Sequence, residues 1–435
     1  MTAHPLGAPG YEEEAIRDRA RRGAAAVFPE PGSYGRALLG AEPGGPAGGD
    51  PLDRMRIVPP VFVPQRLEKL FDLGEEPLPS DVVLATSIGG FFSPVPLYVS
   101  AFGSTQVASS TLGEDLGRQA GRLGIPMVIG ENVVPVNGYG RGGESRPGSL
   151  LARISGYLEA GGTSGGIVVQ QSTQDADAEV WNMVYSDPTV APLLESGRLA
   201  FELKVGQGAK PGLGGITLVD RAAAGSLSDR FQITDTYGSD SDQVVRCATP
   251  GTFTEEILTQ QIRLMRNNYP RCRVWVKLPP GRDIARAVDV ALRAGADAVS
   301  VDGAEGGTGW APRVFLSQVG LGLGECLARI RAAGGAQRGL LASGRMWEGG
   351  RALKCLALGA EAVGLGRAAL LAVAEDPQEG LVRLVEALRL ELQLLISALG
   401  KYDVSALSPE DLWLPESTAA PAPTASLNSV MGKVS

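Results

Sequence analysis

The stretch Val299-Ser-Val-Asp-Gly-Ala-Glu-Gly-Gly-Thr-Gly-Trp-Ala-Pro312 carries the most information about the fold of this chain. It predicts a short buried strand that runs directly into a glycine-rich loop. The glycines let the backbone approach a flat or anionic ligand closely, and Thr308 adds a hydroxyl donor. Two similar junctions follow, Leu340-Leu-Ala-Ser-Gly-Arg345 and Ala362-Val-Gly-Leu-Gly-Arg367. In a barrel of alternating strands and helices all three would open on one rim, where the last two loops commonly bind phosphate.

The same strand–helix alternation extends over most of the chain. Eight strands are predicted near Leu97–Ala101, Ile125–Ile129, Gly166–Gln170, Ala200–Val205, Arg273–Lys277, Ala298–Val301, Leu340–Ser343 and Ala362–Leu365. Helical patterns are clearest at Glu12–Phe28, Thr105–Leu123, Asp283–Ala294, Pro312–Ala333, Gly349–Leu358 and Gly380–Leu399. Eight strands favour a closed (β/α)8 barrel, the TIM barrel, over an open doubly wound sheet.

Three segments are expected around this pattern. Residues 1–58 form an N-terminal extension that is partly flexible, 59–405 form the barrel, and 406–435 form a mostly flexible tail rich in Pro, Ala, Ser and Thr. After the fourth strand the chain makes a long insertion, 206–272, before the fifth. Long loops inside compact domains are usually functional, so we expect this one to lie over the active site.

The composition limits the classes of partner. The chain has 435 residues, 44% of them hydrophobic, and a formal net charge of -8. An acidic balance argues against nucleic acid, because phosphate binding usually requires a basic surface. No apolar run is long enough to span a membrane, and the first twelve residues lack the pattern of a secretory signal. We therefore expect a cytoplasmic protein.

Cysteine and histidine are informative because they are scarce. Cys247, Cys272, Cys326 and Cys355 lack the spacing of a zinc site, an iron–sulfur cluster or a redox dithiol. They are expected to be reduced and mostly buried, and no bound metal is expected. The single histidine, His4, lies in a Pro/Gly-rich start. Acid–base chemistry is therefore expected from Lys, Glu, Asp, Tyr or Cys.

The glycine and cation motifs resemble a known family. Gln207-Gly-Ala-Lys-Pro-Gly212 with Gly214-Gly215, Arg246 before Thr249-Pro-Gly251, and Gly306-Gly-Thr-Gly309 are similar to the FMN-binding synthase domain of glutamate synthase. Ser100-Ala-Phe-Gly103 and Gly130-Glu131 also fit that pattern. The resemblance extends over roughly Pro59 to Ser405, and it implies a (β/α)8 fold and bound FMN.

The residues from the last three junctions form the expected phosphate site of the flavin. Backbone N–H groups in glycine turns and at helix starts stabilise a dianion. The set is Gly306, Gly307, Thr308, Gly309, Ser343, Gly344, Arg345, Gly364, Gly366 and Arg367. A barrel that binds another phosphorylated ligand would use the same turns, and the resemblance favours FMN.

Other residues are expected around the flavin ring. Lys277 ends a strand at the barrel mouth, where a cation can stabilise the reduced, anionic ring at its N1–O2 edge. The alternative is a lysine that extends to solvent from a strand end. Lys204 lies on the preceding strand, and strand alternation alone leaves its direction open. The resemblance also implies flavin contacts from Ala101, Phe102, Gly103, Gln170, Gln207 and Asp302.

Lys210 and Arg246 are the candidate ligands of a substrate carboxylate. Two cations on one long insertion suit a small dicarboxylate or amino acid, although surface ion pairs would give the same pattern. In the family the matching lysine and arginine hold 2-oxoglutarate, which implies the same substrate class here. Glu131 matches an acidic residue near the substrate and is the candidate proton carrier.

Several positions depart from the family pattern. The run Leu370-Leu-Ala-Val-Ala-Glu-Asp-Pro377 has no cysteine where the family has the three ligands of a [3Fe–4S] cluster, so no cluster is expected. Ile216 replaces a polar residue of the lysine loop, and Ala304-Glu305 replaces His-Asp. The chain begins Met1-Thr-Ala3, without the cysteine nucleophile that releases ammonia from glutamine.

These patterns lead to one expected function and its alternatives. We expect an FMN-dependent oxidoreductase acting on CH–NH2 donors, with hydride transfer between flavin N5 and the α-carbon of a 2-amino, 2-imino or 2-oxo carboxylate. An FMN-dependent isomerase, an oxidase of a specialised pathway and a non-catalytic subunit of a larger synthase remain alternatives. The expected partners are the small amino or oxo acid, an electron-donor or amine-donor protein, and a second copy of the chain.

Overall fold

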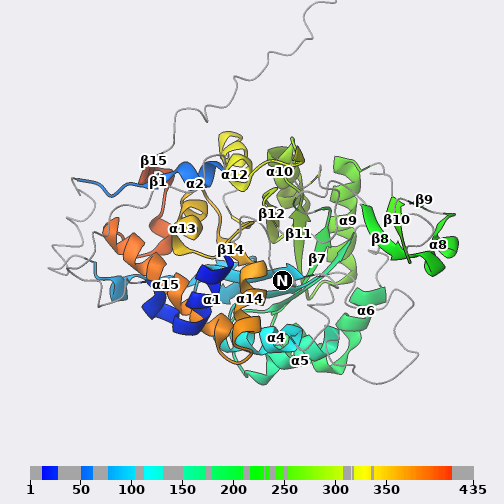
Figure 1. The fold of residues 1–435 in the computed structure, drawn as a ribbon, viewed down its shortest axis with the longest axis horizontal. Coiled ribbons are helices and arrows are strands. Elements are labelled where there is room, and N and C mark those ends of the chain that lie inside the picture. Colours follow the sequence, from blue (N-terminus) through cyan, green and yellow to red (C-terminus); the bar gives the residue numbers. More distant parts are fainter. Residues whose placement is uncertain are drawn as a thin grey trace, which may run out of the picture.

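Eight parallel strands form a closed barrel in this computed structural model (Figure 1). The structure describes residues 12–27, 50–61, 77–102, 112–130, 150–172, 179–206, 208, 216–229, 231–235, 242–247, 253–306, 315, 318–334 and 338–413. In barrel order the strands are β4 (Leu97–Phe102), β5 (Met127–Ile129), β6 (Ile167–Ser172), β7 (Leu199–Lys204), β11 (Arg273–Leu278), β12 (Ala298–Asp302), β13 (Leu340–Ser343) and β14 (Ala362–Leu365). The predicted (β/α)8 fold is confirmed, and each strand overlaps its predicted range.

Helices on the outside cover the strands and alternate with them along the chain. They are α4 (Leu112–Leu123), α5 (Leu150–Glu159), α6 (Glu179–Ser186), α7 (Ala191–Glu195), α9 (Glu255–Asn268), α10 (Ile284–Ala294), α12 (Leu323–Ala332), α13 (Gly349–Ala357), α14 (Arg367–Glu375) and α15 (Gly380–Ala398). Helix α10 illustrates why they form. Ile284, Val288 and Ala291 recur on one face and are buried, and Gly295 ends the helix in the left-handed region.

Two predicted helices differ from the structure. The pattern from Pro312 to Ala333 is not one helix: Phe315 and Gln318 are helical, but Val319–Gly322 is not, and α12 starts after it. Gly320 has a φ of 99°, which breaks the helix. The first helix is likewise shorter than predicted. Helix α1 (Glu13–Arg22) ends at Gly23, and a 3-10 turn, Gly23–Val27, follows.

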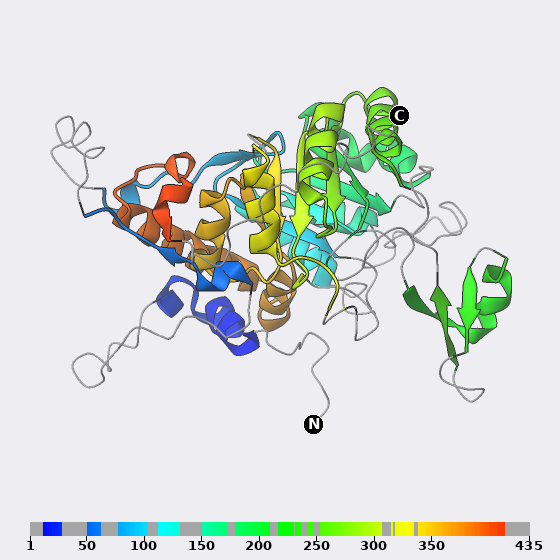
Figure 2. The same cartoon turned by 90° about the horizontal axis from the view of Figure 1, so that it is seen from above.

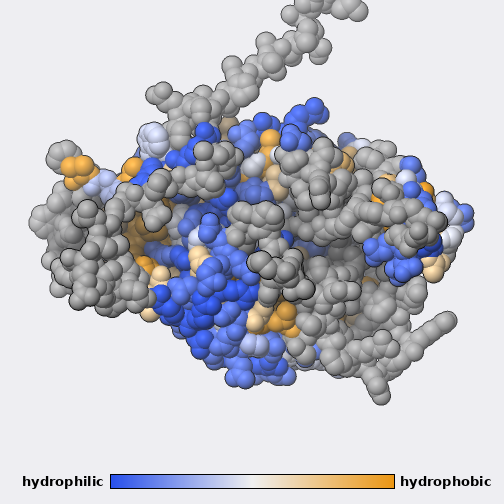
Figure 3. Space-filling view, viewed as in Figure 1, coloured by the Kyte–Doolittle hydropathy of each residue, from blue (hydrophilic) through white to orange (hydrophobic). Residues whose placement is uncertain are grey.

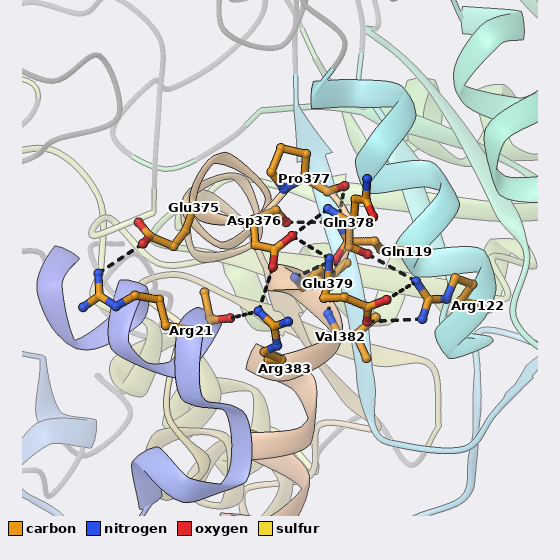
Figure 4. A network of polar contacts seen from close by, with 12 residues as sticks. Arg21, Gln119, Arg122, Glu375, Asp376, Pro377, Gln378, Glu379, Val382 and Arg383 are labelled. Atoms are coloured by element: carbon orange, nitrogen blue, oxygen red, sulfur yellow. Dashed lines mark hydrogen bonds and ion pairs between the residues drawn. The ribbon is translucent and has the colours of Figure 1, made fainter.

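The N-terminal helix α1 packs against α14 and α15, the last two α-helices of the described chain. In Figure 4, Arg21 pairs with Glu375 at 3.1 Å, and Arg383 pairs with Asp376 at 2.7 Å. Gln119 of α4 bonds to both sides of the turn between α14 and α15, at the Pro377 carbonyl and the Leu381 N–H. This face is mainly hydrophilic at its surface (Figure 3).

The insertion after β7 forms a small unit of its own. Strands β8 (Ile216–Asp220), β10 (Gln243–Cys247) and β9 (Gln232–Thr234) make an antiparallel sheet, with α8 (Arg221–Leu227) beside it. Figures 1 and 2 both show this sheet to one side of the barrel. The sequence patterns predicted a long loop here and missed the sheet.

Short elements complete the described chain. A hairpin of β2 (Thr86–Ile88) and β3 (Phe91–Ser93) precedes the barrel. The short helix α2 (Pro51–Arg54) leads into β1 (Arg56–Ile57), which pairs with β15 (Leu412–Trp413) near the other end of the described chain. Short 3-10 turns lie at Pro79–Asp81, Pro188–Val190, Val404–Ala406 and Pro409–Asp411. No helix among the described residues is both long and apolar enough to cross a membrane.

Candidate active site at the carboxyl end of the barrel

The inside of the barrel changes from apolar to polar along the strands. One inward side chain from each strand builds an apolar cluster near the amino ends: Tyr98, Val128, Val168, Ala200, Trp275, Ala298, Leu341 and Ala362. The hairpin adds Ile88 and Phe91 to this cluster, and the Trp275 indole donates to the Gly89 carbonyl at 3.1 Å. Apolar side chains therefore fill and close the barrel at the amino ends of its strands.

Two residues further along, every strand presents a polar side chain or glycine. Because side chains alternate along a strand, these residues point to the same interior, one level nearer the carboxyl ends. This polar layer consists of Ser100, Gly130, Gln170, Glu202, Lys277, Ser300, Ser343 and Gly364. Polar groups in a protein interior are normally retained only with partners or for a function, so the polar layer is the candidate site.

Lys277 lies at the centre of the charges in this layer. Its ammonium is 3.1 Å from an Asp302 carboxylate oxygen, and both side chains are buried. The other Asp302 oxygen accepts a hydrogen bond from the Ser343 hydroxyl. Burial alone would lower the pKa of Lys277, but the charges of Asp302 and Glu202 outweigh it and raise the pKa. Lys277 is thus a fixed cation inside the barrel and does not extend to solvent.

Glu202 is the residue that the sequence patterns missed. Its carboxylate accepts a 2.5 Å hydrogen bond from the Gln170 amide, and the side chain is 1% exposed. Burial raises the pKa of Glu202 to about 7, although Lys277 opposes the rise. An acidic residue at an inward position of an otherwise apolar strand was the available signal. The same alternation settles the direction of Lys204, which lies two residues beyond Glu202 and so faces the same interior.

The raised pKa of Glu202 makes stability depend on pH. The folded protein holds this proton more tightly than the unfolded chain, so stability is greatest below the ordinary pKa of about 4.5 and falls as pH rises toward about 7. Glu202→Gln cannot ionise. We expect it to match the parent near pH 5 and to exceed it by about 2 kcal/mol above pH 7. Urea unfolding of both proteins at several pH values measures this difference. The same pH dependence of the free energy of unfolding in the parent and in Glu202→Gln would contradict it.

Ser100 offers a test of whether a ligand fits this layer. Its hydroxyl is buried and has no hydrogen-bond partner among the residues that the structure describes. Gly364 lies directly against it, because a methyl group on Gly364 would be 2.1 Å from the Ser100 oxygen. A buried, unsatisfied hydroxyl at the barrel mouth suits a ligand with polar edge atoms, and FMN has such atoms.

The glycine loops of the rim lie close together. The Gly303 N–H donates to the Ser343 carbonyl at 3.0 Å, which joins the loops after β12 and β13. A methyl group on Gly208 would be 3.1 Å from the Gly306 carbonyl, so the loop after β7 reaches the same place. At Gly366, before α14, an added methyl group would meet no atom of the described residues within 4 Å. The chain is thus closely packed between these loops, and the first turn of α14 offers N–H groups that can bind phosphate.

The arginines of the rim differ from the expected picture. The guanidinium of Arg345 pairs with Asp53 of α2, a residue to which the sequence patterns gave no role. Arg367 is the first residue of α14. Arg246 lies in the small sheet, where its guanidinium is 4.4 Å from the centre of the Phe231 ring. Arg246 therefore belongs to the small sheet, whereas the polar layer belongs to the barrel.

The other predicted site residues fall into two groups. Ala101 packs against the apolar interior cluster, at an irregularity in the pairing of β4 with β5. The backbone of Phe102 ends β4. Outside the described residues lie Gly103, Glu131, Gln207, Lys210, Gly307, Thr308 and Gly309. Among the cysteines, Cys272, Cys326 and Cys355 are buried and Cys247 is partly buried, and none forms a disulfide, as expected.

A cavity adjoins the rim on the side of β11 and β12. Its volume is about 420 Å³, and Gly208, Pro280, Arg282, Gln318 and Gly320 are among the residues that line it. These residues lie in loops that follow the carboxyl ends of strands. The cavity therefore opens on the same end of the barrel as the polar layer.

Comparison with known proteins finds one family that matches part of the chain. Residues 190–375 match the family described as a conserved region in glutamate synthase. The archaeal-type glutamate synthase [NADPH] of Dehalococcoides mccartyi is 34% identical over 186 residues, which are 41% of this chain and 36% of that protein. The chain contains a glutamate-synthase-like domain. It spans between 34% and 40% of the length of the glutamate synthase relatives that it matches.

Solved structures with a similar fold extend over more of the chain. A mutant of the active chimera of (S)-mandelate dehydrogenase has a TM-score of 0.54 and 19% identity, and the match covers 93% of this chain and 99% of that one. A mandelate oxidase mutant with an FMN adduct has a TM-score of 0.50 and 20% identity, covering 83% and 88%. At this level of identity the likeness concerns the fold, which extends beyond the glutamate-synthase-like domain.

Proposed function

We propose that this protein is an FMN-dependent oxidoreductase whose substrate is a small 2-amino, 2-imino or 2-oxo carboxylate. The observation that carries the proposal is the polar layer around Lys277, at the mouth of a barrel that contains a glutamate-synthase-like domain. The FMN adduct of the mandelate oxidase, a protein of similar fold, supports the choice of flavin. FMN, when bound, supplies hydride transfer at its N5 atom.

The residues of this chain have distinct proposed roles. Lys277 supplies a buried positive charge for the pyrimidine edge of the flavin, and the Ser100 hydroxyl and Gln170 amide border the same interior. Gly344, Gly366 and the start of α14 would hold the phosphate with backbone N–H groups, whereas the Gly306 N–H already donates to the Gly303 carbonyl at 2.8 Å. Because Arg345 is paired with Asp53, the phosphate site depends less on side-chain charge than the sequence suggested.

For the substrate, we retain Lys210 and Arg246 as proposed carboxylate ligands and Glu131 as the proposed proton carrier. The cavity of about 420 Å³ beside the rim has room for a small amino or oxo acid. Arg246 lies in the sheet beside the barrel, so its proposed role is tested separately from that of Lys210. Glu202, which holds a proton near neutral pH, is a second group that could exchange one inside the barrel.

Anaerobic flavin spectroscopy tests this function. The protein should bind one FMN per chain, released FMN and not FAD should appear on chromatography, and the spectrum should lack iron–sulfur bands. A suitable amino acid, or reduced pyridine nucleotide in the presence of an oxo acid, should change the 450 nm flavin band. Absence of FMN after reconstitution would exclude the proposal. Bound FMN that no candidate substrate or reductant changes would favour a non-redox role, such as an isomerase.

The same assay separates the two proposed carboxylate ligands. Lys210→Ala and Arg246→Ala should each weaken apparent substrate affinity about ten- to a hundredfold and leave FMN bound, since a charge-assisted hydrogen bond is worth roughly 1.5–3 kcal/mol. Arg246→Lys should also lose affinity, because a point charge cannot replace the planar fork. Unchanged substrate affinity in Arg246→Ala and Arg246→Lys would show that Arg246 does not bind the substrate.

A further inference from the structure

A buried network of opposite charges lies behind the glycine rim. We call it the rim cluster: Asp50 and Asp53 from the start of α2, Glu305 from the loop after β12, Arg345 from the loop after β13, and Arg351 from the first turns of α13. Figure 1 shows α2 beside α12 and α13, which come much later in the sequence, and α2 contacts both helices. The rim cluster therefore joins the N-terminal extension to the site.

Arg351 is the centre of the rim cluster. It is 2% exposed, and its guanidinium donates to Asp50 at 2.7 Å, to Asp53 at 2.9 Å and to Glu305 at 2.5 Å. Its Nε donates to the Gly344 carbonyl at 3.2 Å. One side chain thus connects α2 with the loops after both β12 and β13. A guanidinium can do this because it presents five donors in a fixed plane.

The carboxylates of the rim cluster also hold the start of α12. Asp50 accepts from the Gly324 N–H at 2.8 Å, and Glu305 accepts from the Leu323 N–H at 3.2 Å. These are donors of the first helical turn, which has no partner within the helix. Asp50 and Glu305 therefore each contact both Arg351 and α12. Movement of either would displace the loop that contains Gly303 and Gly306.

We propose that Arg351 and Asp50 are positioning residues for the cofactor, which hold the glycine loops after β12 and β13 in the arrangement that binds FMN. This rests on the proposed function, and it goes beyond it by making the N-terminal extension part of the site. The two loops meet tightly, since a methyl group on Gly344 would be 3.3 Å from the Gly303 nitrogen. A ligand that depends on backbone N–H groups needs those groups fixed in place before it binds.

The charge balance of the rim cluster should make the affinity for FMN depend on pH. Burial raises the pKa of Glu305 to about 7, and the charge of Asp50 adds to the rise. With Glu305 protonated, two carboxylates balance two guanidinium groups; with Glu305 ionised, the rim cluster has one excess negative charge. The other titratable and charged groups around it include Glu325, Cys326 and Arg329 of α12, Glu348 at the start of α13, and Lys354 and Cys355 of α13. An excess negative charge beside the rim disfavours an anionic phosphate.

Titration of the apoprotein with FMN, followed by quenching of flavin fluorescence, tests the positioning role. Arg351→Lys keeps the charge but cannot reach four acceptors, so it should raise the Kd for FMN at least tenfold. Asp50→Asn is a milder change and should raise it about fivefold. The control is Arg286→Lys, which alters an exposed bidentate pair with Glu255 on the outer helices and should leave the Kd unchanged.

Two further readouts exclude a purely structural effect. Hydrogen exchange should speed up in residues 303–306 and at Gly344 in both rim variants, with the barrel strands unchanged. Between pH 6 and 8 the parent should lose affinity for FMN more steeply than Glu305→Gln, by about twofold to tenfold, because only the parent gains a charge. Free FMN titrates identically in both experiments, so the difference between the two proteins reports Glu305.

The outcomes separate this inference from the proposed function. A parent protein that binds no FMN overturns the proposed function. A parent that binds FMN, with Arg351→Lys and Asp50→Asn within twofold of it, overturns the positioning role alone, even if both variants melt at lower temperature. Identical pH profiles for the parent and Glu305→Gln overturn the role of Glu305.

Discussion

Lys277→Met should lower the free energy of unfolding by about 3–5 kcal/mol, because it leaves the Asp302 carboxylate buried without its cation. The flavin, where it still binds, should become harder to reduce, since a fixed positive charge no longer stabilises the reduced ring. Urea unfolding gives the first quantity and anaerobic dye titration the second. The potential is the readout that a purely structural role of Lys277 would not change.

A second variant separates the charge from the shape. Lys277→Met with Asp302→Asn removes both ions, so it should recover most of the lost stability while the potential stays low. The exposed pair of Arg293 and Asp289 provides the control, and Arg293→Met should cost less than about 1 kcal/mol. A Lys277→Met protein as stable as the parent would show that the buried pair is not held as described.

Gly364→Ala should destabilise the barrel by about 3 kcal/mol and reduce its flavin content, because the mouth has no room for one more methyl group. That methyl would lie 2.1 Å from the Ser100 oxygen and 2.6 Å from the Tyr98 ring. The ring cannot withdraw, since it packs edge-on against Trp275 at 6.2 Å between ring centres. Forcing extra atoms into a packed interior typically costs 1–3 kcal/mol.

Gly350→Ala is the matched control for this change. Gly350 lies in α13, and an added methyl group there meets nothing within 4 Å. Alanine favours a helix over glycine by up to about 1 kcal/mol, so the control should be neutral or stabilising. Thermal unfolding of both variants and the flavin content after reconstitution measure the two effects. A Gly364→Ala protein with the stability and flavin content of the parent would contradict the packing argument.

The two layers of the barrel interior explain why these effects should be large. Trp275 and the hairpin residues Ile88 and Phe91 exclude water from one end of the barrel. The carboxyl group of Glu202 and the charges of Lys277 and Asp302 lie in the next layer, where they are poorly hydrated and interact strongly. A ligand at the mouth would therefore meet a fixed electrostatic field.

The order of strands and the position of the glycine loops were readable from the sequence alone. Apolar runs such as Ala298–Val301 and Leu340–Ser343 predict buried strands, and the glycines that follow them predict tight loops at the same rim. Lys277 could be placed at the mouth because it ends such a run. Each of these features depends on a short stretch of residues, so it can be predicted without knowledge of the rest of the chain.

Partners and proton affinities were decided only by the tertiary structure. Arg345 reads as a phosphate ligand in the sequence, yet it pairs with Asp53, nearly three hundred positions earlier. The pKa of Glu202 rises only because closure of the barrel removes its carboxylate from water. Local patterns name the residue types and the faces they occupy. Which charges meet, and how deeply they are buried, depends on contacts between distant segments, and these exist only once the barrel has closed.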